Sequence, residues 1–137
     1  MELYKSSYRI IKSQWGIAID ITGEITLFDK DKEKGYRKID DGLWIRIISI
    51  LKCEEKEYIY TGLKDISKLI INASPYKNNT LIRIHAIDYN PCDYQIEGLI
   101  PAIYQWISGI LTINTPKIET KFNKSLNKYE FIYSSDI

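Results

Sequence analysis

The chain has 137 residues, of which 45% are apolar and 27% charged, and its net charge is +1. This length fits one domain, and the composition is typical of a folded protein rather than a disordered one. The balanced charge excludes recognition of a partner through a strong global field. Arginine, the usual bidentate reader of phosphates and bases, occurs four times against 15 lysines, which disfavours a nucleic-acid partner.

Targeting and redox signals are absent from the pattern. The first twelve residues lack the apolar run of a signal peptide, and no apolar stretch reaches the length of a membrane span. Cys53 and Cys92 are far apart and form neither a metal-binding nor a redox spacing. We therefore expect a cytoplasmic protein with reduced thiols, without a membrane partner, metal or cofactor. The richness in Ile, Lys, Asn and Tyr is typical of AT-rich coding and indicates a bacterial or phage source.

The first third of the chain predicts strands. Residues 3–12 form one candidate, and 15–21 alternate apolar and small or polar side chains, as in a half-buried strand. Thr22-Gly23 permits a bulge or a tight turn, and strand character resumes at 25–28. The charged segment 29–42 is expected to be a loop.

The middle of the chain predicts a strand pair and a helix. Residues 43–53 are almost continuously apolar, which favours a central strand, although Arg46 requires a partner if it is buried. Glu54-Glu55-Lys56 is expected to form a hairpin turn and 57–61 the returning strand. Apolar spacings of three and four then predict a helix over 63–73, with Thr61 as a candidate cap.

The last third predicts a strand, a helix and a hairpin. Residues 81–89 form the strand, and the helix starts at Asn90 or Asp93. Pro101 inside this pattern either kinks the helix or begins it. Residues 118–122 and 129–133 are expected to pair. The predicted fold is a single α+β domain over residues 1–137, a mostly antiparallel sheet with two helices packed on one face.

The strand–helix turn is the first candidate site. Tyr89, Asp93, Tyr94, Gln95 and Glu97 crowd one short segment. Tyrosines anchor protein interfaces and carboxylates steer association, so these five residues are the predicted partner-binding set. Acidic residues at a helix start also stabilise the helix without any further role.

An alternative site adds the preceding strand. Arg83 and His85 alternate on one strand face and, with Asp93 and Glu97, could bind a small molecule or nucleotide, possibly as an enzyme. This alternative predicts a concave pocket joining these side chains. No Ser-His-Asp or Cys-His arrangement is readable, so no catalytic residue is assigned.

Two further patterns have simpler explanations. Asp29, Asp31 and Glu33 resemble the start of a calcium loop, but Lys34 occupies the glycine position, which indicates a solvated charged turn. Tyrosines at 58 and 60, or at 129 and 133, alternate on predicted strands and could expose a docking face. The same residues also favour strands intrinsically.

Residues 89–102 resemble the strand–turn–helix of the fourth domain of elongation factor G, whose strand ends in Tyr-His-x-x-Asp-Ser. Tyr89 and Asp93 match, whereas Asn90 and Tyr94 replace the His and Ser. In size and composition the chain is similar to small bacterial toxin-immunity proteins and phage inhibitors. That similarity implies a non-enzymatic, protein-binding inhibitor of a toxin–antitoxin type, with another protein as partner.

Overall fold

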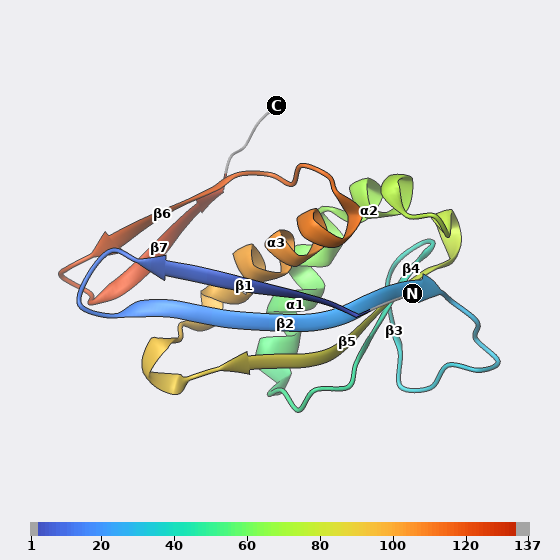
Figure 1. Cartoon of the computed structure of the whole chain (residues 1–137), viewed down its shortest axis with the longest axis horizontal. Helices are drawn as coiled ribbons and strands as arrows, with labels where there is room; N and C mark the ends of the chain where they lie inside the picture. The colour runs from blue at the N-terminus through green and yellow to red at the C-terminus, as the bar shows by residue number, and fades with distance from the viewer. Residues whose placement is uncertain (1–2, 134–137) are drawn as a thin grey trace.

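The computed structural model describes residues 3–133, which form a five-stranded sheet with helices on one face and a separate hairpin (Figure 1). The sheet order is β1-β2-β5-β4-β3, in which β4 and β5 are parallel and the other neighbours antiparallel. The predicted α+β fold is confirmed. The strands are β1 Tyr4–Ile11, β2 Gly16–Leu27, β3 Arg37–Asp40, β4 Leu43–Ile47, β5 Thr80–Tyr89, β6 Ile118–Asn123 and β7 Lys128–Tyr133. The helices are α1 Cys53–Asp65, α2 Ser67–Ala73 and α3 Leu99–Leu111, with 3-10 turns at Lys77–Asn79, Pro91–Asp93 and Ile96–Gly98.

The core lies between the sheet and the helices. Alternation along β2 sends Ile17, Ile19, Ile21 and Ile25 to this face, where each is almost completely buried. They pack with apolar residues of α1 and α3 in one cluster. Trp106 of α3 is fully buried and donates its indole N–H to the carbonyl oxygen of Tyr4 at 2.9 Å.

Of the bulge or tight turn predicted at Thr22-Gly23, the structure has an irregularity of register, in which the extra residue is His85 of β5. The register between β2 and β5 shifts between Thr22 and Gly23, and β2 continues through this point without turning. A Cβ on Gly23 would lie 2.6 Å from the carbonyl oxygen of Arg83 and 3.1 Å from the ring of Trp106. Glycine therefore permits this close approach of the two strands beneath α3.

The predicted hairpin over residues 54–61 is wrong, because this segment is part of α1. The β4 strand ends at Ile47, and the side chain of Glu55 accepts the backbone N–H of Lys52 at 2.9 Å in the first turn. Gly62 lets α1 approach α3 closely. The predicted helix over 63–73 is divided into the end of α1 and α2, so three helices rather than two occupy the described chain.

The start of α3 resolves the position of Pro101. The chain makes two 3-10 turns after β5 and becomes helical at Leu99. Pro101 therefore lies in the first turn, where a backbone N–H has no partner within the helix and none is lost.

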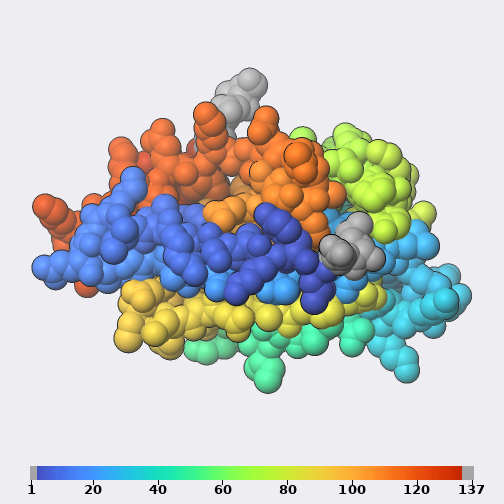
Figure 2. All heavy atoms as spheres, viewed as in Figure 1, coloured from blue at the N-terminus to red at the C-terminus, as the bar shows by residue number. Residues whose placement is uncertain are grey.

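The predicted closing hairpin is confirmed as β6 and β7, which form their own two-stranded sheet. Tyr129 holds it to the main fold: its ring packs edge-on against Trp15 and Phe122, both at 5.0 Å between centroids. Its hydroxyl donates to the Trp15 carbonyl oxygen at 2.6 Å and accepts the Lys12 N–H at 2.8 Å. The space-filling view shows β1, β2 and β5 as adjacent bands, with α3 and the hairpin beyond β1 (Figure 2).

Candidate protein-binding groove

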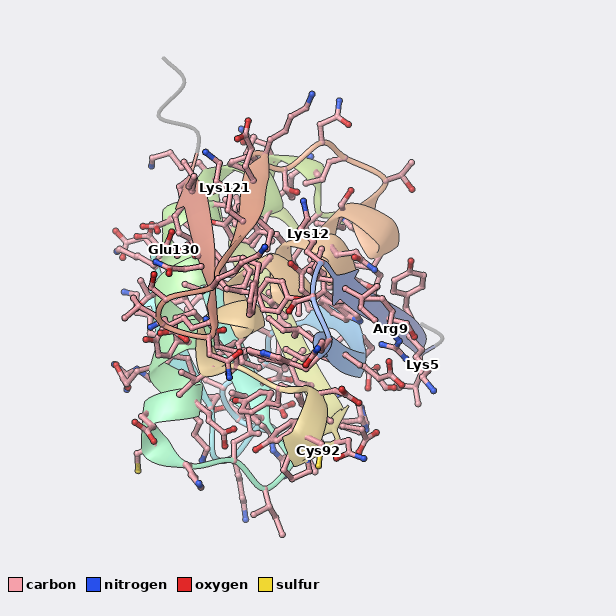
Figure 3. The ribbon with its side chains drawn as sticks, turned by 90° about the vertical axis from the view of Figure 1, so that its left-hand side faces the viewer. Lys5, Arg9, Lys12, Cys92, Lys121 and Glu130 are labelled. Carbon is pink, nitrogen blue, oxygen red and sulfur yellow. The ribbon has the colours of Figure 1, made fainter. Side chains whose placement is uncertain are left out.

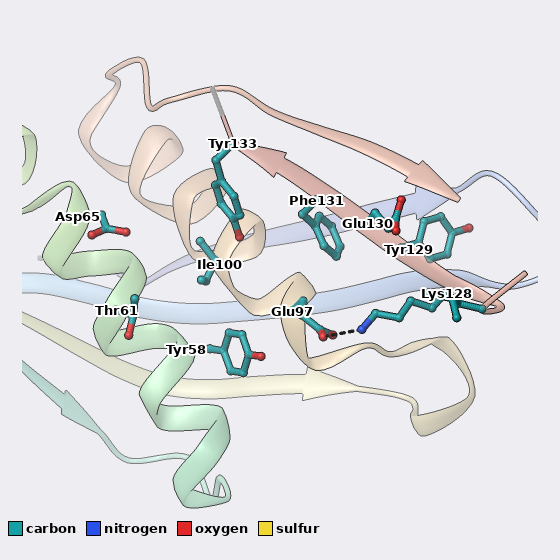
Figure 4. Close-up of a pocket in the computed structure, with 11 residues that line it drawn as sticks. Tyr58, Thr61, Asp65, Glu97, Ile100, Lys128, Tyr129, Glu130, Phe131 and Tyr133 are labelled. Carbon is teal, nitrogen blue, oxygen red and sulfur yellow. Dashed lines mark hydrogen bonds and ion pairs between the residues drawn. The ribbon is translucent and has the colours of Figure 1, made fainter. Parts of the chain in front are cut away.

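A groove of about 570 Å³ lies between α1, the start of α3 and β7 (Figure 4). Tyr58, Thr61 and Asp65 of α1 form one wall, and Phe131 and Tyr133 of β7 form the other. The remaining lining residues belong to the α3 start and the hairpin: Glu97, Ile100, Leu126, Lys128, Tyr129 and Glu130. Helical periodicity on α1 and strand alternation on β7 thus bring two aromatic-bearing faces opposite each other.

The groove combines aromatic walls with negative charge. Three carboxylates line it, those of Asp65, Glu97 and Glu130, against one ammonium group, that of Lys128. Lys128 is already paired with Glu97 at 3.1 Å. Asp65 has no ion-pair partner within residues 3–133. The net charge of the groove is therefore negative, although the whole chain is almost neutral.

Titration behaviour agrees with this crowding. Burial in the groove wall raises the pKa of Tyr133, and the neighbouring Tyr58, Asp65 and Glu97 add to the rise. Burial alone would raise the pKa of Glu97, but hydrogen bonds from its own backbone N–H and from Lys128 leave that pKa below its usual value. Glu97 therefore stays ionised at neutral pH.

Three of the five predicted partner-binding residues have internal roles. Tyr89 and Tyr94 stack at 3.6 Å between ring centroids, and their hydroxyls donate to Glu55 Oε2 at 2.7 and 2.6 Å. The side-chain amide of Gln95 donates to the Tyr129 carbonyl oxygen at 2.7 Å and accepts the Tyr129 N–H at 2.8 Å. These side chains fix the turn to α1 and to β7.

The other two predicted residues point to different places. Glu97 lines the groove. Asp93 lies by a separate cavity of about 270 Å³ at the ends of β1 and β2, together with Arg9 and Ile17. The structure thus brings one of the five predicted residues into the groove, and the aromatic residues Tyr58 and Tyr133, predicted as docking candidates, join it there.

Arg83 and His85 lie on the open face of the sheet, away from the helices and from Glu97. Arg83 donates to Glu24 at 3.2 Å and to Glu33 at 2.6 Å, and His85 Nε2 is 2.7 Å from Glu24 Oε2. The structure does not bring these two residues together with Asp93 and Glu97. Because two carboxylates already occupy the Arg83 guanidinium, little of its charge remains for a ligand.

The segment after β2 folds over this open face. Glu33, 6% exposed, also accepts from Arg46 at 3.2 Å, which supplies the partner that the apolar strand required. Hydrogen bonding by Arg83 holds the pKa of Glu33 below its usual value. The ring of Phe28, at the start of the same segment, stacks on the ring of Trp44 in β4 with 4.0 Å between their centroids. Glu33 is thus a partner of two arginines. This role depends on how the strands pair, and the sequence of the loop alone does not predict it.

The two basic residues on β1 are balanced by an acidic residue on the neighbouring strand. Viewed from the hairpin end, Lys5 and Arg9 of β1 lie on one side of the molecule, and Lys121 and Glu130 of the hairpin lie on the other (Figure 3). Both basic residues pair with Asp20, at 3.7 and 2.8 Å. Hydrogen bonding by Arg9 lowers the pKa of Asp20.

Among residues 3–133, no group of three or more His, Cys, Asp or Glu side chains is arranged to hold a metal ion. Cys53 and Cys92 are exposed and free. None of the helices described is both long and apolar enough to cross a membrane. Comparison with models of known protein families, with curated proteins and with solved structures gives no match. The geometry of the groove therefore carries the functional argument.

Proposed function

We propose that the chain is a non-enzymatic interaction protein that binds and neutralises another protein, such as a bacterial toxin, through the groove between α1 and β7. The observation that supports it is the pairing of accessible aromatic walls with unbalanced carboxylates. Buried tyrosines contribute strongly at protein interfaces, and rim charges steer association. The partner surface should therefore present an apolar side chain beside a lysine or arginine.

Tyr133 is the best single anchor in this proposal. It is 46% exposed, it lines the groove, and it makes no side-chain hydrogen bond within the described chain. Phe131 beside it is half-buried and supports the wall. Truncation of an interface hot spot costs about 2 kcal/mol or more, which is roughly a thirtyfold loss of affinity.

The test is a pull-down from lysate of the native host, with wild type, Tyr133→Ala and the control Ile50→Ala as baits. Ile50 is 99% exposed and lies outside the groove, in the segment between β4 and α1. We expect one protein to be retained by wild type and Ile50→Ala and lost by Tyr133→Ala. Co-expression with that protein should then restore growth if it is toxic.

Two results would overturn the proposal. Equal retention of every protein by Tyr133→Ala and wild type would exclude the groove as the binding site. A groove-dependent partner whose activity is unchanged by saturating amounts of this chain would exclude neutralisation.

A further inference from the structure

We infer that the bound segment of the partner is an extended strand that pairs with the outer edge of β7. This inference rests on the proposed function and specifies the occupant of the groove. It follows from the direction of the backbone groups of β7, from the contrast with the end strands of the five-stranded sheet and from the groove's charge.

Gln95 shows which way the β7 backbone points. Its amide bonds both the N–H and the carbonyl oxygen of Tyr129, as a neighbouring strand would. These two groups therefore point away from β6, and Phe122–Tyr129 is a pair without ladder hydrogen bonds. Opposed residues in an antiparallel pair alternate between bonded and non-bonded types. The unbroken register of β6 and β7 extends this alternation to Phe131.

The backbone N–H and carbonyl oxygen of Phe131 consequently face the same edge as those of Tyr129, toward the groove. No side chain or loop backbone within residues 3–133 takes them up. The side-chain amide of Gln95 pairs with the backbone groups of Tyr129, whereas the backbone groups of Phe131, two residues further along the same edge, are available for pairing. An incoming strand would continue the pairing that Gln95 begins.

Features that hinder strand addition occur at both ends of the five-stranded sheet, and the distal half of β7 has none of them. At one end of that sheet, α3 lies against β1 and donates side-chain N–H groups to the carbonyl oxygens of Tyr4 and Ser7. At the opposite end of the sheet, β3 is four residues long and begins with Arg37-Lys38. Short edge strands, charged side chains and covering helices or loops commonly prevent another strand from pairing with the edge of a sheet. The run Phe131-Ile132-Tyr133 carries no charge.

The residues that line the groove determine which side chains the incoming strand must carry. Side chains alternate along an extended segment, so one apolar side chain can enter between Tyr58 and Phe131 while a basic side chain reaches the free carboxylate of Asp65. A volume of about 570 Å³ lies within the usual range for binding sites, about 300–1,000 Å³. The occupant is therefore an extended peptide segment with an apolar residue and a lysine or arginine.

The experiment uses a phage-displayed library of random linear dodecapeptides selected on the full chain, with selected peptides resynthesised. Phe131→Pro removes the outward N–H and no ladder bond, whereas Phe131→Ala removes the same side chain and retains the N–H. We expect enriched peptides to carry Lys or Arg and to bind Phe131→Pro about tenfold more weakly than Phe131→Ala, as for one lost hydrogen bond.

Nuclear magnetic resonance on the wild-type complex provides a second readout that does not depend on the proline variant folding. Hydrogen exchange at the Phe131 amide should slow on binding, with cross-strand contacts between β7 and the peptide. Peptides that need Tyr133 but leave Phe131 exchange unchanged would overturn strand addition while leaving groove binding intact. Selection of no groove-dependent peptide would overturn the inference, and the pull-down alone would then decide the proposed function.

Discussion

Tyr94→Phe should destabilise the fold, because the Tyr94 hydroxyl is one of three donors to the buried carboxylate of Glu55. The other two are the Tyr89 hydroxyl and the Lys52 N–H. A hydrogen bond to a charged group contributes about 1.5–3 kcal/mol, and we expect a loss of this size in the free energy of unfolding. For a domain of this length the melting temperature should fall by about 6–12 °C.

The assay is urea unfolding followed by circular dichroism, in a double-mutant cycle with Glu55→Gln. Because the two groups are in direct contact, the coupling energy should be about 1–2 kcal/mol. Tyr36→Phe is the matched control, since Tyr36 is exposed and its hydroxyl makes no hydrogen bond within the described residues. It should change the free energy of unfolding by less than about 0.5 kcal/mol.

The pH dependence identifies the carboxylate. Burial alone would raise the pKa of Glu55, but hydrogen bonds from Tyr94, Lys52 and Tyr89 outweigh it, so the folded-state pKa lies below the ordinary value of 4.5. Its stabilisation is therefore full well above pH 4.5 and is lost as the pH falls through the folded-state pKa. The difference between wild type and Tyr94→Phe should shrink in acid. A Tyr94→Phe protein as stable as wild type, or a difference constant down to low pH, would refute this reasoning.

Three further predictions concern the sheet and its loops. Glu33→Ala removes a shared partner of two arginines, so the loop over the open face should be cut faster by trypsin, with the exposed Asp31→Ala in the same loop as control. Gly23→Ala should lower the free energy of unfolding by about 1–3 kcal/mol in urea titrations, because its Cβ meets backbone. Asp40 should titrate near pH 2 by nuclear magnetic resonance, and Ser67→Ala should raise that pKa, since the Ser67 hydroxyl donates to it at 2.6 Å.

For each of these three predictions, a specific result would contradict it. Equal cleavage of Glu33→Ala and Asp31→Ala would mean that the ion pairs do not hold the loop. A Gly23→Ala protein as stable as wild type would show that β2 and β5 can separate at the bulge without cost. An unshifted Asp40 titration in Ser67→Ala would assign the low pKa to other donors.

The strands were predictable where alternation is local. Residues 15–21 and 81–89 each direct one face of a strand toward the core, and the resulting alternation of apolar side chains is visible in the sequence. The helix α1 was missed because Tyr58 and Tyr60 favour strands intrinsically, whereas the packing of Gly62 against α3 that secures the helix is a tertiary contact. Propensity was overridden there by packing.

The groove could be predicted only in part. Tyr58 and Tyr133 were candidates for a docking face because they are aromatic, but their meeting depends on α1 being a helix. The role of Gln95 depends on the position of the hairpin relative to the turn, which no local pattern encodes. The pairing of Arg83 with Glu33 similarly spans fifty residues.

The attachment of the hairpin has a mechanical consequence. Within the described residues, the hydrogen bonds and ion pairs from β7 to the rest of the fold converge on Lys128 and Tyr129. The distal half, with Phe131 and Tyr133, is held by side-chain packing alone. The position of the β7 wall of the groove therefore depends on polar contacts made by its first two residues.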